Sequence, residues 1–305
     1  MRGDDVDGRK VGEFLALAFG LSWAVAAGLV LAGVEIGTLE WTFFLLVGFM
    51  WAPAIAAIVV QWRRGASVRT TCGLAVGRLG WVGLAWVTPV ALLAGTVAIA
   101  TTLPGVSFTT DYGAFLLEAG LPPEAVEEAV AELEALPVPP AVLFVVQGLV
   151  VGLTINAVAA LGEELGWRGL LLSELAPMGF WKLSILTGAV WGVWHAPIVL
   201  QGYNFPDAPV AGVAVMTGWT IVASPAYTYL TVRARSVLAA TFLHGSFNGL
   251  AGLSLVYLEG STLLTTPVGV AGIGAALLLT AACVAHDRLG ADVPITTGGP
   301  LSPWE

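Results

Sequence analysis

The chain has 305 residues, of which 57% are apolar and only 11% are charged, and its mean hydropathy is +0.86. Because soluble domains carry about 25% charged residues, this composition excludes a soluble globular domain and indicates an integral membrane protein whose surroundings are the lipid bilayer. The net charge of −9, from 12 Lys and Arg against 21 Asp and Glu, argues against nucleic acid as a partner.

Apolar runs long enough to cross the hydrocarbon core, which needs about 20 helical residues, recur along the chain. They cover residues 11–33, 41–62, 80–103, 140–162, 183–201, 209–231, 236–257 and 267–285. The predicted fold class is therefore all-α, a polytopic transmembrane helical bundle of about eight helices in which residues 11–288 form a single transmembrane domain. The fourth helix is expected to continue past the charges that follow it, to about Leu175.

Eleven of the twelve basic residues fall on one side when these spans are threaded alternately through a membrane. The opposite connections carry acidic residues and no Lys or Arg, and one of them, 104–139, is expected to hold a short acidic surface helix. The positive-inside rule then predicts that both termini, including segment 1–10, are cytoplasmic. We expect a protein of a prokaryotic cell membrane, with a disordered cytoplasmic tail at 289–305 that is rich in Gly, Pro and Thr.

Three charges interrupt the apolar sequence at "LGEELGWRGLLL", residues 161–172. On a helix Glu164 and Arg168 are one turn apart and can pair, whereas Glu163 points about 140° away from Arg168. This geometry leaves Glu163 as an unpaired buried carboxylate, which is a candidate general base. The alternative is that the helix ends near Gly162 and that all three charges lie in cytoplasmic water.

The second intramembrane motif is "WGVWHAP", residues 191–197. His195 lies 13 residues after Lys182, about 20 Å into the bilayer, and Trp191 precedes it by one turn on the same face. Pro197 is expected to kink the helix at this point. The alternative interpretation is a hydrogen-bonded packing histidine.

The third motif is "HGSFNG", residues 244–249, in which His244 and Asn248 share one helix face. Gly245 and Gly249 have the same spacing and would let a neighbouring helix approach closely. Here the alternative is an Asn–His pair that only joins helices. Counted from the helix ends, Glu163, His195 and His244 reach a similar depth, about 13–20 Å from the inner face, which predicts one site inside the bundle.

The ordered set EExxxR, aromatic-xxx-His and HxxxN on three membrane helices, residues 163–248, resembles the CPBP family. This family comprises the CAAX-protease and bacteriocin-processing (or abortive-infection) intramembrane proteases, including type II CAAX prenyl endopeptidases. The motif region here is about 140–257, and the expected number of helices suits the bundle of that family. Trp191 stands where Phe is commoner.

The resemblance implies catalytic and supporting roles for these residues. Glu163 with His195 would activate a water molecule for attack on the scissile carbonyl, and His244 with Asn248 would form the oxyanion hole. Glu164 would pair with Arg168, and Trp191 would support the site. An alternative is a zinc ion held by Glu163, His195 and His244; the absence of HExxH and the Asn beside His244 favour a glutamic-type mechanism with no cofactor.

The expected function is therefore intramembrane hydrolysis of a peptide bond. The substrate would be a membrane-associated peptide or protein, of CAAX type or a leader peptide, with its scissile bond near the cytoplasmic face. One alternative is a transporter or channel with a buried Glu/His/Arg relay, which broken helices in matched half-repeats would favour. Another is a non-catalytic immunity or scaffold protein on the same fold.

Overall fold

The computed structural model describes residues 5–118 and 120–305, so Arg2, one of the basic residues used to predict the topology, lies outside the described residues. The described chain is an all-α bundle with one antiparallel pair of two-residue strands. Its elements are α1 (Gly8–Leu31), α2 (Leu39–Phe44), the π-helix η1 (Leu45–Phe49), α3 (Ala52–Arg63), α4 (Val68–Thr71), α5 (Leu79–Ala100), β1 (Ser107–Phe108), α6 (Tyr112–Glu118), α7 (Pro123–Glu134), α8 (Pro140–Leu153), α9 (Ile155–Glu164), the π-helix η2 (Leu165–Leu171), α10 (Leu172–Leu175), the 3-10 turn η3 (Ala176–Met178), α11 (Phe180–Trp194), α12 (Ala196–Leu200), α13 (Pro209–Ala234), α14 (Val237–Leu250), α15 (Leu253–Tyr257), β2 (Leu258–Glu259), α16 (Thr262–Thr265) and α17 (Val270–Leu289).

Each predicted span falls in helical structure, but several are divided into consecutive helices, and not every helix is long enough to cross a bilayer alone. Within the described chain, five helical segments pass that test: Gly8–Leu31, Leu39–Arg63, Leu79–Ala100, Pro209–Ala234 and Thr262–Leu289. A sixth is the pair Pro140–Leu153 and Ile155–Met178, which is bent by 53°. The predicted eight spans thus correspond to five or six full-length helices and to α11 and α14, which have only 15 and 14 residues.

The break in the fourth span falls at Thr154. Its hydroxyl donates to the carbonyl oxygen of Val150 at 2.9 Å, a bond that competes with the helical backbone and commonly bends a helix. Beyond the break, helical structure continues through η2 to Leu175, as the sequence predicts. The alternative in which the helix stops near Gly162 is therefore wrong.

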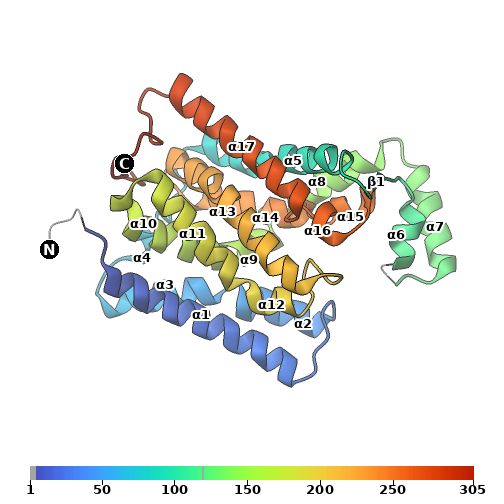
Figure 1. Cartoon of the computed structure of the whole chain (residues 1–305), viewed down its shortest axis with the longest axis horizontal. Coiled ribbons are helices and arrows are strands. Elements are labelled where there is room, and N and C mark those ends of the chain that lie inside the picture. The colour runs from blue at the N-terminus through green and yellow to red at the C-terminus, as the bar shows by residue number, and fades with distance from the viewer. Residues whose placement is uncertain (1–4, 119) are drawn as a thin grey trace.

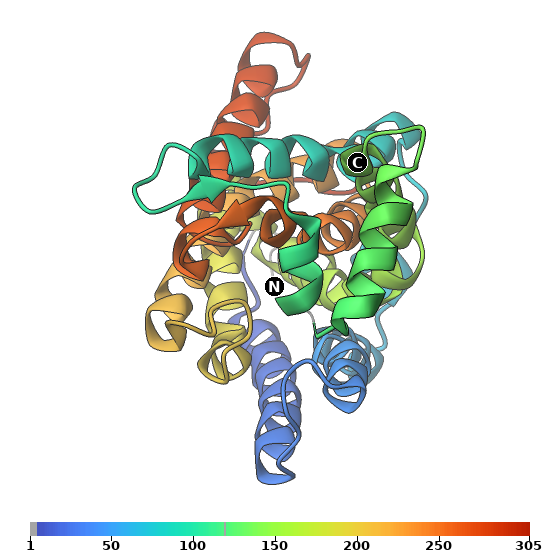
Figure 2. The same ribbon diagram turned by 90° about the vertical axis from the view of Figure 1, so that its right-hand side faces the viewer.

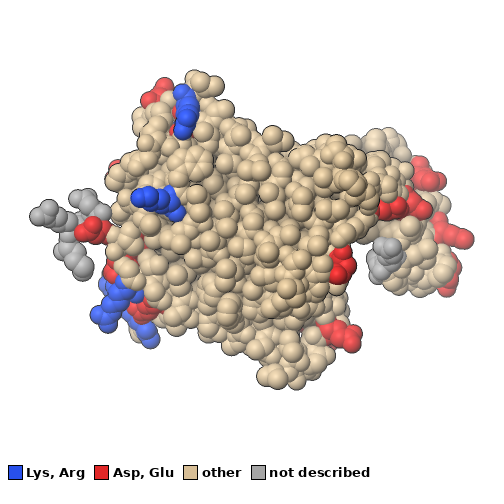
Figure 3. All heavy atoms as spheres, viewed as in Figure 1, with Lys and Arg blue, Asp and Glu red and all other residues tan. Residues whose placement is uncertain are grey.

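The start of α1 and the C-terminus lie at the same end of the bundle (Figure 1). On the face drawn in Figure 3, the visible Lys and Arg side chains gather at this end, and acidic side chains alone mark the opposite end. We call these the basic end and the acidic end. The distribution agrees with the separation of charges along the sequence.

Helix α14 lies at the centre of the bundle, in contact with α5, α8, α9 and α13. Glycines allow this close packing, because a side chain at Gly245 would meet the carbonyl oxygen of Gly152 at 2.5 Å. At Gly249 the same clash would occur with the carbonyl oxygen of Gly148, at 2.3 Å. The predicted close approach of a helix at Gly245 and Gly249 is confirmed, and α8 is the helix concerned.

The C-terminal segment 289–305 packs against the basic end, which differs from the expected disorder. The indole N–H of Trp304 donates to the carbonyl oxygen of Thr71 at 3.0 Å and to the hydroxyl of Ser173 at 2.9 Å. The amide of Leu301 donates to the carbonyl oxygen of Ala176 at 3.0 Å. Composition predicted disorder, but a few apolar anchors bind the segment to the helices.

At the acidic end, α6 and α7 form a hairpin that covers one side of the bundle, drawn in green in Figure 2. The predicted surface helix is α7, which begins at Pro123 and buries Val126 alone. The strands β1 and β2 join this hairpin region to the segment before α16. This end therefore consists of short elements and loops, which frame the cavity described next.

Candidate active site

Glu164 and Arg168 form the predicted pair, and both are buried, with exposed side-chain fractions of 0% and 1%. The guanidinium group lies 3.1 Å from each carboxylate oxygen. It is also held between two aromatic rings, with its carbon 4.4 Å from the ring centre of Trp191 and 4.6 Å from that of Tyr227. These contacts fix Arg168 in place and offset the cost of burying its charge.

Glu163 is also buried, and as predicted it forms no ion pair with Arg168 among the described residues. Its carboxylate accepts a hydrogen bond from the indole N–H of Trp191 at 2.7 Å. Its other carboxylate oxygen makes no hydrogen bond with the described residues. Trp191 therefore links the two glutamates: its N–H orients Glu163, and its ring stacks on the arginine that neutralises Glu164.

His195 occupies the break between α11 and α12, close to Pro197 as predicted. Its backbone amide donates to Gly192 instead of Trp191, so the carbonyl oxygen of Trp191 is free to bond the ring Nδ1 of His195 at 2.8 Å. Because a carbonyl only accepts, Nδ1 carries the hydrogen and the neutral ring keeps Nε2 as an acceptor. No direct hydrogen bond joins Glu163 and His195 within the described structure.

His244 and Asn248 share one face of α14 and differ in burial. The ring Nδ1 of His244, 4% exposed, lies 2.8 Å from Glu164, a bond that the sequence did not predict. Asn248, one turn later, is exposed within the interior space of the bundle. Glu164 thus connects Arg168 to His244, so the supporting pair also sets the orientation of the third motif.

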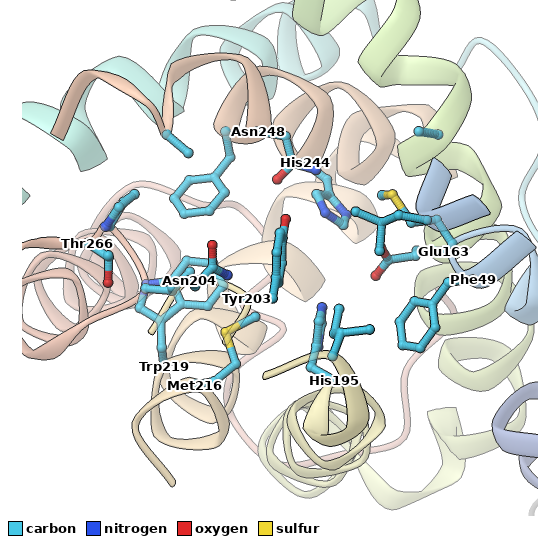
Figure 4. A pocket seen from close by; sticks show the side chains of 18 of the residues that line it. Phe49, Glu163, His195, Tyr203, Asn204, Met216, Trp219, His244, Asn248 and Thr266 are labelled. Carbon is cyan, nitrogen blue, oxygen red and sulfur yellow. The ribbon is translucent and has the colours of Figure 1, made fainter. Parts of the chain in front are cut away.

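One cavity of about 510 Å³ brings the three motifs together, since Glu163, Trp191, His195, His244 and Asn248 all line it (Figure 4). The rest of its wall is mostly apolar. It includes Ile36, Phe49, Met50, Ile198, Met216, Trp219, Phe247 and Leu255, with Asn156, Tyr203, Asn204 and Thr266 as additional polar residues.

The cavity extends from the buried charges toward the acidic end, where residues 202–204, Pro206 and residues 266–268 line it. These residues belong to the loops at α12 and α16, opposite the basic end (Figure 1). The sequence predicted a scissile bond near the cytoplasmic face, which the positive-inside rule expects at the basic end. The cavity instead extends from the motifs toward the acidic end, where the short helices α12, α15 and α16 each contribute a residue to its wall.

A second cavity, of about 600 Å³, lies beneath the α6–α7 hairpin and against α8 and α14. Its wall is largely apolar and includes Tyr112, Phe115, Leu133, Phe144 and Val256. It meets the first cavity at Asn156, Asn248 and Gly252, which line both.

The zinc set considered from the sequence does not assemble. Among the residues that the structure describes, no group of three or more His, Cys, Asp or Glu side chains is placed to hold a metal ion. The Nδ1 atoms of His195 and His244 bond within the protein, and Trp191 bonds one oxygen of Glu163. These bonds leave Nε2 of each ring and the other oxygen of Glu163 open, so they do not by themselves distinguish a zinc site from a metal-free one. The metal-free site therefore stays a prediction.

The sequence analysis did not single out the four additional polar residues of the cavity wall, and Asn156 and Tyr203 illustrate why. Asn156 is a lone amide inside an apolar span, two turns before Glu163, and intramembrane polar residues of this kind are a recognisable signal. Its side chain donates to the carbonyl oxygen of Gly245 at 3.3 Å. Tyr203 lies in a loop between spans, so no helical periodicity indicates where it points.

The fold and this site define an integral membrane protein with a buried Glu/His/Asn site that faces a cavity inside its helical bundle. Residues 145–250 match the family model described as Type II CAAX prenyl endopeptidase Rce1-like, and the match contains every residue of the three motifs. This match confirms the resemblance expected from the motifs and supports an intramembrane endopeptidase of CAAX type in general. No curated protein sequence matches the chain.

Proposed function

We propose that this protein is a glutamic-type intramembrane endopeptidase that uses Glu163 to activate water. The observation that carries the proposal is the different surroundings of the two adjacent glutamates. Glu164 is neutralised by Arg168 and bonded to His244, whereas Glu163 faces the cavity with one oxygen free of protein hydrogen bonds. Only Glu163 is available to take a proton from a water molecule.

In the proposed reaction, a water molecule between Glu163 and His195 attacks the scissile carbonyl carbon. Glu163 takes one proton of that water, the new C–O bond forms, and the carbonyl electrons move to its oxygen. His244 and Asn248 donate hydrogen bonds to this oxyanion. For this role His244 carries a proton on both ring nitrogens, because its Nδ1 donates to Glu164 and its Nε2 must also be a donor. When the C–N bond breaks, the proton held by Glu163 passes to the departing amine, so the base is restored. The acceptor nitrogen of His195 orients the water.

The proposed substrate is a membrane-associated peptide or protein with an extended apolar segment, in agreement with the apolar wall of the cavity. We propose that it enters from the acidic end, which the positive-inside rule assigns to the side opposite the cytoplasm. Transport is less well supported, because the described helices contain one bent pair and not two in matched halves.

The peptidase proposal is tested with two quenched fluorogenic peptides in liposomes, a farnesylated CAAX-type peptide and a leader-type peptide with an apolar segment. Wild type should cleave at least one of them, and Glu163→Gln should lower kcat by about 10²–10⁴-fold, because proton abstraction is lost while shape is kept. Glu164 is unsuitable as a control, since it supports His244. Failure of wild type to cleave either peptide contradicts the proposal.

The metal-free mechanism has a separate test. Purified protein should contain no stoichiometric metal, and cleavage should persist after exhaustive chelation. A bound metal ion whose removal abolishes cleavage, and whose return restores it, would replace the glutamic mechanism with the metal-dependent one.

The proposed orientation is tested by placing a single cysteine at Ser261 or at Ser67, both exposed, after Cys72 and Cys283 have been replaced. An impermeant thiol reagent added to intact cells should label only the cysteine at Ser261, because the acidic end faces outward. Labelling at Ser67 alone would reverse the orientation and the predicted side of substrate entry.

A further inference from the structure

Tyr203 projects into the catalytic cavity from the loop between α12 and α13. Figure 4 shows its ring between the two walls of the cavity, with the hydroxyl directed to the side on which His244 and Asn248 lie. None of the hydrogen bonds of the described residues involves this hydroxyl. A polar group that lines a largely apolar cavity without a protein partner is available for a ligand.

The loop holds Tyr203 in this position by contacts on both sides. Phe205 is fully buried and packs on Gly212, where a side chain would come within 2.6 Å of its ring. Asp207 accepts hydrogen bonds from the hydroxyls of Ser261, at 2.7 Å, and Thr262, which ties the loop to the segment at the start of α16.

The ring of Tyr203 also packs against Trp41, with ring centres 5.4 Å apart. Together with the two loop anchors, this contact orients the phenol before any ligand binds. Such preorganised donors are what stabilises developing charge in enzyme sites.

Burial and the negative charge of Glu163 raise the pKa of Tyr203 to about 12. The phenol therefore keeps its proton throughout the neutral and mildly alkaline range. It can donate a hydrogen bond, but it cannot serve as a base in that range. This property suits a group that stabilises a negative oxygen.

We propose that Tyr203 is a third oxyanion donor, whose hydroxyl donates to the scissile carbonyl oxygen beside His244 and Asn248. The assignment rests on the proposed peptidase function, and it adds a residue outside the three sequence motifs. The hydroxyl donates a hydrogen bond without transferring its proton, so the path of protons through Glu163 is unchanged. The ring also forms part of the wall that keeps bulk water from the site.

The test is Tyr203→Phe in liposomes with the peptide that wild type cleaves, measured alongside Glu163→Gln. Removing the hydroxyl should lower kcat by about 10²-fold with little change in KM, because the donor acts in the transition state. The melting temperature and the shape of the pH profile should not change, because the hydroxyl bonds no protein group and does not titrate in this range. The matched control is Tyr257→Phe, whose hydroxyl lies 3.4 Å from that of Tyr112 and outside the catalytic cavity, and it should retain full activity.

The outcomes separate this inference from the function on which it rests. If Glu163→Gln is inactive while Tyr203→Phe equals wild type, the assignment of Tyr203 alone is overturned. A raised KM with unchanged kcat also overturns it, since the hydroxyl would then bind substrate and transition state equally. If Glu163→Gln keeps full activity, the peptidase mechanism itself fails.

Discussion

Two buried carboxylates of this protein are each paired with an arginine, yet only one belongs to the candidate active site. Glu164 lies in the middle of the bundle between Arg168 and His244. Asp287 lies at the basic end, where it accepts hydrogen bonds from Arg233 and from backbone amides of the C-terminal segment. Both side chains are completely shielded from solvent.

The difference between the two regions lies in what surrounds the ion pair. Beside Glu164, a second carboxylate, Glu163, opens into a cavity that also holds His195 and Asn248. Asp287 lines neither of the two cavities, and both of its oxygens are used in holding the tail. A buried ion pair alone therefore does not distinguish a catalytic site from a purely structural contact. The mark of a reactive site is an incompletely bonded neighbour that faces open space.

The largest expected effect on stability is that of Arg168→Ala, which would break the central ion pair. It leaves Glu164 buried beside a single histidine, and losing one partner of a buried pair costs about 3–5 kcal/mol. Unfolding in detergent should report this loss against wild type. A variant as stable and as active as wild type would show that the Glu164–Arg168 pair contributes as little to stability as an ion pair on the solvated surface.

The next effect concerns the cavity side of the comparison. Asn248→Ala should lower kcat by about 10²–10³-fold with little change in KM, because one oxyanion donor is removed. Asn248→Asp should be at least as damaging, since a carboxylate repels the forming oxyanion. Near-wild-type turnover of the Asp variant in the peptide assay would rule out the oxyanion role of this residue.

Asp287→Asn should have a smaller effect than the two preceding changes, and it should affect stability but not catalysis. It weakens the bonds to Arg233 and to the tail, and a buried hydrogen-bonding defect costs about 1–3 kcal/mol. The free energy of unfolding should fall by this amount, while kcat of the folded protein stays at the wild-type value. A selective loss of cleavage would contradict the separation of the two regions.

The smallest expected change tests whether the basic end is closed. Cys72 is fully buried there, and burial raises the pKa of its thiol to about 12. At pH 8 only about one thiol in 10⁴ is then ionised, and the thiolate is the reactive form. N-ethylmaleimide should leave Cys72 unmodified in the folded protein and label it after unfolding. Rapid labelling of the native protein would show that the tail does not seal this end.

Several features of the site could be predicted from the sequence because they depend on distances along one helix. The Glu164–Arg168 pair follows from one-turn spacing, and the convergence of Glu163, His195 and His244 follows from their similar depth. The apolar runs likewise place the helices to within a few residues. These predictions use only helical periodicity and the thickness of the bilayer.

Other features depend on contacts between distant segments, which no local pattern contains. The bond from His244 to Glu164 requires the relative rotation of α14 and α9. The bend at Thr154 arises from a side-chain bond that competes with the helical backbone within an apolar run. Helix α11 ends at Trp194, shortly before Pro197, within a run that also remains apolar. The position of Tyr203 depends on anchors beyond its own loop. For residues 289–305, the average polarity predicted disorder because it gives no weight to single residues such as Trp304, which bonds to a distant helix.

The contacts of the C-terminal segment can form only after the rest of the chain has been synthesised. Trp304 bonds to Thr71, which precedes it by 233 residues, so the surface around α4 waits uncovered until residue 304 has left the ribosome. At about 5–20 residues per second, this delay is roughly 10–50 s. The transmembrane helices can therefore be inserted and paired well before the basic end closes. Closure of that end is a late step in maturation, to be sought in pulse-labelled nascent chains and not in the finished protein.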